Sequence, residues 1–279
     1  MKKKILSVVL AVLTVSLLVG GCGKSKDTAA GTAGATFSKE TPVTLKVLSD
    51  QVPHSELLNF VKPKLAEQGI NLEITILAND HGNEDVDNGE FDVNFFQHQP
   101  YLDSVNKEKG YDLANAGNIH VEPIGLYSVK YKTKEEIPEG AVIGIPNDVT
   151  NEFRALKILE SNGFIKLKAD LPAYSATVKD VAEYTKKIEI KEIDSAQLIR
   201  LKDDFAAYIT NTNKILEAGI DANTALFREG KDSPYANILV TKKSRVNDAA
   251  IVALKNALTT EEVRKFIEEK YKGAVIPAF

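Results

Sequence analysis

The sequence has 279 residues, of which 43% are hydrophobic and 27% charged, and its formal net charge is −4. This length and composition suit a folded chain with one large core or two modest ones, and they exclude a disordered protein. A mildly acidic chain without a basic block argues against nucleic acid as a partner. One cysteine excludes an internal disulfide framework, and four scattered histidines argue against a dedicated zinc site. We therefore expect no metal and no cofactor.

The N-terminal segment has the pattern of a secretion signal. Three lysines at 2–4 precede the apolar run ILSVVLAVLTVSLL, which is short for a spanning helix, since that needs about 20 apolar residues. We predict a signal peptide at 1–21. The small residues before Cys22 resemble the lipobox of bacterial lipoproteins, in which the cysteine is lipidated; the alternative is an ordinary leader with an incidental cysteine. The segment 22–42 is rich in Gly, Ala, Ser and Thr and predicts a flexible tether.

From Pro42 onward, strand and helix patterns alternate. Strands are predicted at 43–48, 72–77 and 91–96, a helix at 55–66, and a short turn or helix at 85–88. Strand, helix and strand at this spacing predict βαβ units and a largely parallel sheet.

A second group of elements begins near Gly125. It comprises a strand at 142–145, a helix capped at 146–148 and ending at 162–163, strands at 188–190, 205–209 and 237–240, and helices at 248–258 and 260–271. The count predicts an α/β fold of two lobes, the first formed by 43–125 with 226–279 and the second by 126–225. We expect the chain to cross between the lobes more than once and to leave a ligand cleft between them.

The sequence gives little support for an enzyme. It contains no G-x-S-x-G, H-E-x-x-H, P-loop, or G-x-G-x-x-G after a strand. The adjacent carboxylates at 203–204 and 135–136 point apart on a helix or strand, so they are poor acid–base pairs. We therefore predict a binding protein.

Aromatic and polar residues follow the third predicted strand in the stretch Phe95-Phe96-Gln97-His98-Gln99-Pro100-Tyr101. Phe96 and His98 share one strand face, and we expect them to line an apolar slot with polar rims. We expect Phe95 in the core. Tyr101 either joins the slot or merely starts a helix.

A polar cluster lies where the strand at 142–145 meets its helix. Asn151 and Arg154 are three residues apart, so they share one helix face, and the positive helix end adds to Arg154 as a receptor for an anion. The alternative is that Arg154 pairs with Asp148 or Glu152 on a wet surface. Spacing leaves both open.

Three further asparagines lie beside strands. Asn211 and Asn213 follow one strand, and Asn237 precedes another. Such residues are most often turn or cap residues, whereas an amide that donates and accepts could bind both halves of a zwitterion.

Together, these motifs resemble the methionine-binding lipoprotein family (NlpA type), the substrate-binding component of methionine ABC importers. The matching stretches are Asn94-x-Phe96-Gln97-His98-x-Pro100-Tyr101-Leu102, Gly125-Leu126-Tyr127-Ser128, Ile145-Pro146-Asn147-Asp148-x-Thr150-Asn151-Glu152-x-Arg154-Ala155-Leu156, Ala218-Gly219, Ser233-Pro234-Tyr235-x-Asn237, and Phe266-Ile267 with Gly273-Ala274-Val275.

The resemblance implies a two-lobe, periplasmic-binding-protein-like fold that closes on a small amino acid, methionine first. Arg154 would pair with the ligand carboxylate, three amides would hold its charged groups, and an aromatic wall would take the thioether. The amides are Asn151, Asn211 and Asn237, and the wall is Phe96, His98 and Tyr101. The implied partners are a transporter permease and ATPase, and the implied location is the extracytoplasmic face of the cell membrane, through lipid on Cys22.

Departures from the family pattern fall on the side-chain pocket. The usual aromatic Asp-Tyr-x-x-Pro-Asn stretch is replaced at 79–83, where His81 stands in the region, and the stretches 211–213 and 182–186 also differ. Another small apolar amino acid or a short methionine-containing peptide is therefore an alternative ligand. Two other classes stay open: a surface interaction protein or adhesin with a vestigial cleft, and a metal-ion receptor.

Overall fold

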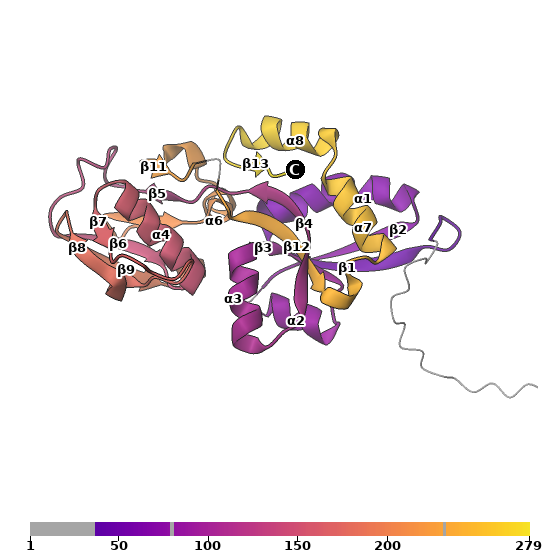
Figure 1. Ribbon diagram of the computed structural model, residues 1–279. Helices are drawn as coiled ribbons and strands as arrows, with labels where there is room; N and C mark the ends of the chain where they lie inside the picture. Colours follow the sequence, from indigo (N-terminus) through magenta and orange to yellow (C-terminus); the bar gives the residue numbers. More distant parts are fainter. Residues whose placement is uncertain (1–36, 79–80, 231–232) are drawn as a thin grey trace, which may run out of the picture. The chain divides into compact units, whose positions relative to one another are not determined.

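The computed structural model describes residues 37–78, 81–230 and 233–279, which all belong to the compact unit Gly31–Phe279. In this unit the strands form two main sheets and one small sheet (Figure 1). The predicted signal peptide, Cys22 and most of the tether lie outside the described residues.

The first sheet has six strands in the order β13-β4-β12-β3-β1-β2. Strands β1 and β2, and β1 and β3, pair in parallel, whereas β12 runs antiparallel to β3 and β4, and β13 runs antiparallel to β4. The strands are β1 (Val43–Ser49), β2 (Ile70–Ile76), β3 (Val93–His98), β4 (Leu113–Val121), β12 (Ala236–Lys242) and β13 (Ile276–Pro277).

The second sheet has five strands in the order β11-β5-β10-β6-β9. Strands β10 and β6, and β6 and β9, pair in parallel, while β5 runs antiparallel to β10 and β11. These strands are β5 (Gly125–Tyr127), β6 (Ala141–Pro146), β9 (Ile188–Ile193), β10 (Ala207–Thr210) and β11 (Phe227–Arg228); β7 (Ile165–Leu167) and β8 (Val181–Tyr184) form the small sheet.

The prediction of a largely parallel sheet is wrong, because both main sheets are mixed. The chain leaves the first sheet at the carboxyl end of β4 and returns to the same edge at the start of β12. Because β12 starts on the side of the sheet where β3 and β4 have their carboxyl ends, it must run in the opposite direction, and it is antiparallel to both.

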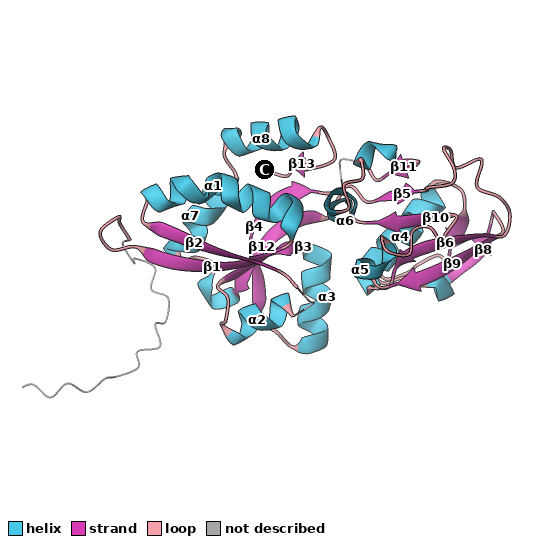
Figure 2. Ribbon diagram, turned by 180° about the vertical axis from the view of Figure 1, so that it is seen from behind, coloured by secondary structure: helices cyan, strands magenta, loops and turns pink. Residues whose placement is uncertain are grey.

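Helices cover both faces of the first sheet, as both views of the ribbon show (Figure 2). Side chains alternate along β12, so each face of the strand contributes to a different apolar cluster. Leu239 packs in the core that holds Ile251 and Leu254. Ile238 and Val240 point to the opposite face of the sheet, where they pack in a smaller cluster with Val86 and Leu102. The helices on the first face are α1 (Glu56–Glu67), α7 (Ala249–Leu258) and α8 (Glu261–Tyr271), and those on the second are α2 (Gly82–Asn88) and α3 (Gln99–Lys109).

The second sheet packs against α4 (Val149–Ser161), whose apolar face contributes Leu156 and Leu159 to a core with Ile143 and Ile209. The short helices α5 (Ser195–Leu198) and α6 (Thr212–Glu217) follow β9 and β10. Asp148 caps α4 as predicted, because its side chain accepts the backbone N–H of Asn151 at 3.0 Å.

The chain passes between the two main sheets twice, once between β4 and β5 and once between β11 and β12, so it crosses more than once, as we expected. The described parts of the two connections meet where the backbone N–H of Glu229 donates to the backbone oxygen of Ile124 at 2.9 Å. Gly125 and Phe227–Arg228 pair in the five-stranded sheet, although the predicted boundaries place them in the first lobe; the division into lobes at those residue numbers stays a prediction.

Candidate functional site

A cavity of about 720 Å³ lies where strands of both sheets end. In the first sheet Asp50 follows β1, His98 ends β3 and Glu122 follows β4; in the second, Asp148 follows β6 and Asn211 follows β10. The carboxyl ends of parallel strands are the usual location of ligand sites in α/β proteins. The fold therefore forms a ligand pocket from both sheets.

Six of the seven predicted site residues line this cavity: Phe96, His98, Tyr101, Asn151, Asn211 and Asn237. Arg154 lies behind the wall rather than on it, one helical turn after Asn151 on α4. The contacts that these residues would make with a ligand stay predictions.

Asn151 is held by its neighbours on both sides. Its Nδ2 donates to both carboxylate oxygens of Asp148, at 3.1 and 3.0 Å, and its Oδ1 accepts from Nδ2 of Asn211 at 3.2 Å. Oδ1 also lies 3.2 Å from Nε2 of His98. These contacts fix the orientation of the Asn151 amide in the polar wall, and its contact with a ligand stays a prediction.

The imidazole of His98 is neutral. Burial, followed by the nearby charge of Arg154, lowers the pKa of His98 to about 3. Its Nδ1 accepts the backbone N–H of Tyr101 at 3.2 Å, so the ring proton lies on Nε2 and is donated to Asn151. The ring is thus fixed in one tautomer and presents an uncharged face to the pocket.

The side chains of the expected aromatic wall come from the end of β3 and the start of α3, and their contact with a ligand stays a prediction. The centroids of the Phe96 and Tyr101 rings lie 6.3 Å apart in an edge-to-face arrangement. A Cβ at Gly82 would come within 2.8 Å of the Phe96 ring, so that glycine allows the ring to pack there. Phe95 is fully buried in the core, as expected. His81 is exposed and lies outside the residues that line the pocket.

Arg154 is buried, with 2% of its surface exposed, and its charge is neutralised inside the protein. Its Nε donates to Oε1 of Glu229 at 2.9 Å, and its Nη2 also pairs with that carboxylate. Nη2 donates in addition to the backbone oxygen of Glu122 at 2.8 Å, and the guanidinium carbon lies 4.3 Å from the centroid of the Tyr235 ring. The surface pairing with Asp148 or Glu152 does not occur.

Glu122 and Glu229 lie on the two segments that connect the sheets, so Arg154 ties both connections to α4. Within the part of the chain that the structure describes, the Nη1 nitrogen of Arg154 makes no hydrogen bond.

Sequence reasoning missed an acidic corner of the pocket. Nδ2 of Asn213 donates to Oδ2 of Asp50 at 2.6 Å, and Nζ of Lys214 lies 3.5 Å from the same oxygen. The backbone N–H of Asn213 donates to Oε2 of Glu122 at 2.8 Å. The position of Asp50 two residues after a predicted strand was an available signal, whereas Glu122 follows β4, which was not predicted.

A profile of the NlpA lipoprotein family matches residues 45–279 of the chain. The chain belongs to the NlpA lipoprotein family. Its relatives in this family include the membrane lipoprotein TpN32 of Treponema pallidum, 39% identical over 92% of this chain and 96% of that protein. The methionine-binding lipoprotein MetQ of Bacillus subtilis is 34% identical over 99% of both chains.

Solved structures from the family have the same fold. The crystal structure of lipoprotein Tp32 from Treponema pallidum superposes with a TM-score of 0.82 at 40% identity, covering 84% of this chain and 99% of that one. A nutrient-binding protein from Burkholderia cenocepacia, solved bound to methionine, gives 0.81 at 38% identity and covers 84% of this chain and all of that one. The predicted two-lobe α/β fold of a binding protein, not an enzyme, is thereby confirmed.

Membership in a family of lipoproteins implies attachment to a membrane through lipid. In the described part of the chain, no helix combines the length and the apolar character needed to cross a bilayer.

Proposed function

We propose that this chain is the substrate-binding lipoprotein of an ABC importer on the extracytoplasmic face of the membrane. Its pocket binds an α-amino acid, and methionine is the first candidate. The observation that carries the proposal is the pocket itself, which joins an aromatic wall to amides and charges from both sheets. Relatives named as methionine-binding lipoproteins, and a 38% identical structure bound to methionine, support this ligand.

The charged ends of a free amino acid match charged groups that lie on the polar wall and directly behind it. Asp50 offers a carboxylate to the ligand ammonium at the acidic corner, beside Lys214 and Asn213. Arg154 keeps its Nε edge on Glu229 and directs Nη1 to the ligand carboxylate. Oδ1 of Asn211 and Nδ2 of Asn237, which make no hydrogen bond among the described residues, complete the receptor.

The side chain of the ligand lies against Phe96, His98 and Tyr101. Burial of each CH₂ group there contributes about 0.8 kcal/mol. A short methionine-containing peptide is the second candidate ligand, because the cavity of about 720 Å³ falls within the range of pockets that hold larger molecules.

Transport follows from closure of the two lobes around the ligand. A ligand that touches both sheets favours the closed arrangement by its extra contacts there, and that arrangement docks on the permease and its ATPase. The lipid on Cys22 would keep the protein near these partners.

The test is calorimetry on the purified full chain after its bound ligands have been stripped by unfolding and refolding. The titrants are L-methionine, D-methionine, leucine, a Gly-Met dipeptide and the methionine analogue without the amino group. We expect micromolar or tighter binding of a methionine-containing ligand. Mass spectrometry of the small molecule that co-purifies identifies the natural one. No binding of any titrant would mean that the proposal is wrong and would favour a surface interaction protein.

Two variants test the assigned roles. Asn211→Ala should weaken binding about ten- to a hundredfold, since a hydrogen bond to a charged group contributes about 1.5–3 kcal/mol. Asp50→Asn should weaken methionine binding while leaving the affinity for the analogue without the amino group nearly unchanged. Asn256→Ala on the exposed surface of α7 is the matched control and should bind as the wild type does. Equal loss of both ligands in Asp50→Asn would contradict the ammonium assignment alone.

A further inference from the structure

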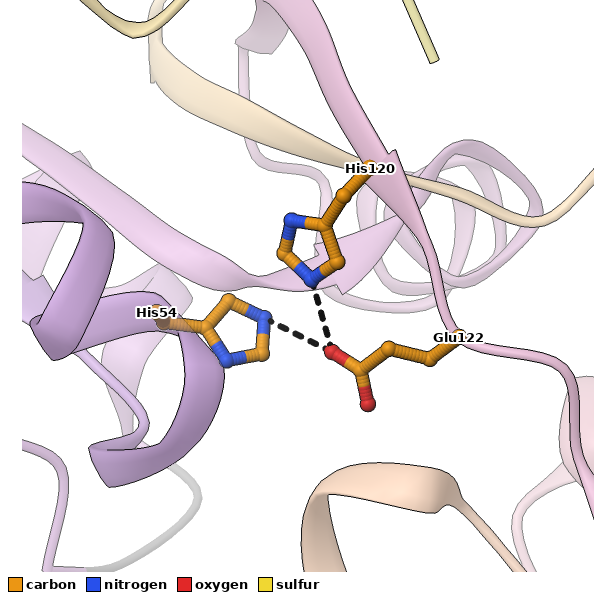
Figure 3. A group of neighbouring side chains, drawn as sticks. All are labelled: His54, His120 and Glu122. Carbon is orange, nitrogen blue, oxygen red and sulfur yellow. Dashed lines mark hydrogen bonds and ion pairs between the residues drawn. The ribbon is translucent and has the colours of Figure 1, made fainter. Parts of the chain in front are cut away.

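Two of the four histidines meet beside the pocket, although they lie far apart in the sequence. His54 lies on the short helical turn Gln51–Ser55 before α1, and His120 lies near the end of β4, two residues before Glu122 (Figure 3). Both histidines are completely buried, and Glu122 is 3% exposed. The sequence argued against a zinc site because its histidines are scattered, so this cluster is visible only in the tertiary structure.

The two imidazoles point at the same carboxylate oxygen (Figure 3). Nε2 of His120 lies 2.8 Å from Oε1 of Glu122, and Nε2 of His54 lies 3.4 Å from it. One potential ligand atom from each of the three side chains lies within 4.8 Å of the others. Oδ1 of Asn237 lies 3.1 Å from Nε2 of His54, which adds a fourth donor atom at the rim.

The donor set is that of a divalent transition metal. Two imidazole nitrogens and one carboxylate oxygen are ligands that Zn²⁺ binds at about 2.0–2.2 Å, with an open position in sites that are not purely structural. Both Nε2 atoms face the same carboxylate oxygen, so one ion placed between them would reach all three side chains. Glu122 is 3% exposed, and a metal ion would give its carboxylate a directly bound cation.

We propose that His54, His120 and Glu122 bind one divalent transition-metal ion, with Zn²⁺ as the first choice, on the inner wall of the pocket. Glu122 and Asn237 both line the cavity, so the open coordination position faces it. Tetrahedral ligands at these bond lengths lie roughly 3.3–3.5 Å apart. The separation of His54 and Glu122 already fits, and that of His120 and Glu122 must lengthen by about 0.5 Å. The two imidazole nitrogens, which lie within 4.8 Å of each other, must come into the same range.

The second ring nitrogens set the expected strength of the site. In the described part of the chain, Nδ1 of His54 and Nδ1 of His120 have no hydrogen-bond partner. Partners at that nitrogen usually strengthen metal binding 10–100-fold. We therefore expect a dissociation constant in the micromolar range, weaker than that of a structural zinc site.

The experiment uses the full chain, purified without a histidine tag and treated with EDTA, and Zn²⁺ alone as the probe. Equilibrium dialysis with elemental analysis should give one Zn²⁺ per chain. His120→Gln should weaken the binding by at least thirtyfold, while His81→Gln, which changes an exposed histidine outside the cluster, should leave it unchanged. Zn²⁺ should raise the melting temperature of the wild type and not that of His120→Gln.

Co²⁺ gives a second measurement that does not depend on a variant. Bound in the proposed set, it should show the visible absorption bands of a tetrahedral or five-coordinate ion in the wild type. This readout decides the question if His120→Gln fails to fold. No stoichiometric Zn²⁺ uptake, no such Co²⁺ spectrum, or equal uptake by a folded His120→Gln would overturn the proposal and leave a metal-free hydrogen-bonded cluster. Amino-acid binding in EDTA is measured separately, so either proposal can fail alone.

Discussion

The ion pair between Arg154 and Glu229 is the most direct place to test the energetics of the site. We consider Arg154→Gln, Glu229→Gln and the double variant. Arg154 is 2% exposed and Glu229 has 16% of its side chain exposed. Removal of one partner from a buried pair costs about 3–5 kcal/mol, because the other charge is left without compensation.

The two single variants should differ in a direction set by their surroundings. Glu229 keeps the hydroxyl of Ser233, 3.0 Å from its Oε2, and some access to water, so Arg154→Gln should cost about 3 kcal/mol. Arg154 in Glu229→Gln keeps an uncharged amide oxygen, one backbone oxygen and the Tyr235 ring but loses its counter-charge, so that variant should cost about 4 kcal/mol. The double variant leaves no unpaired buried charge and should cost less than the sum by at least about 2 kcal/mol.

Urea unfolding of the four proteins, followed by circular dichroism, measures these free energies from the midpoints at constant m-value. Costs that add within about 0.5 kcal/mol would refute the reasoning, because residues that do not interact behave in that way. Methionine titration of the folded variants then separates stability from binding. If Nη1 holds the ligand carboxylate, Arg154→Gln loses binding, whereas Glu229→Gln retains part of it.

Three further predictions concern single positions. Burial, with the neighbouring Glu192, raises the pKa of Glu152 from 4.5 to about 7. Between these pH values the folded state therefore holds a proton that the unfolded state has lost, and the free energy of unfolding should fall as pH rises, by at most about 1.4 kcal/mol per pH unit. In Glu152→Gln the urea midpoints measured from pH 5 to 8 should depend less on pH. Gly144→Ala places a Cβ 2.9 Å from the Phe205 ring and should cost about 1–3 kcal/mol in urea unfolding, unlike the control Gly230→Ala, whose Cβ meets nothing within 4 Å. Asp148→Ala removes the cap of α4 and the hydrogen bonds that hold Asn151, so it should lower the free energy of unfolding by about 1–2 kcal/mol in thermal melts and weaken methionine binding in calorimetry. The control Asp221→Ala, on an exposed turn, should leave methionine binding unchanged.

Local patterns carried much of what the sequence could predict. The alternation of Val43–Ser49 and the cap at Asp148 depend on neighbours a few residues away, and β1 and α4 form close to where these patterns placed them. Helix α3 and strand β4 were missed because their sequences, QPYLDSVNKEK and LANAGNIHV, lack a clear apolar period. They form because the sheet and the His98 cap hold them in place.

By itself, the sequence determined the α/β class, the leader pattern and six of the residues that line the pocket, because these depend on local spacing and on recognisable motifs. Only the tertiary structure decided which charges meet. Arg154 pairs with Glu229, which lies 75 residues later in the sequence, and Asp50 accepts a hydrogen bond from Asn213, 163 residues later. His120 packs beside His54. These contacts depend on two crossings between the sheets and on the antiparallel return of β12, and no short-range pattern encodes the path of the chain between lobes.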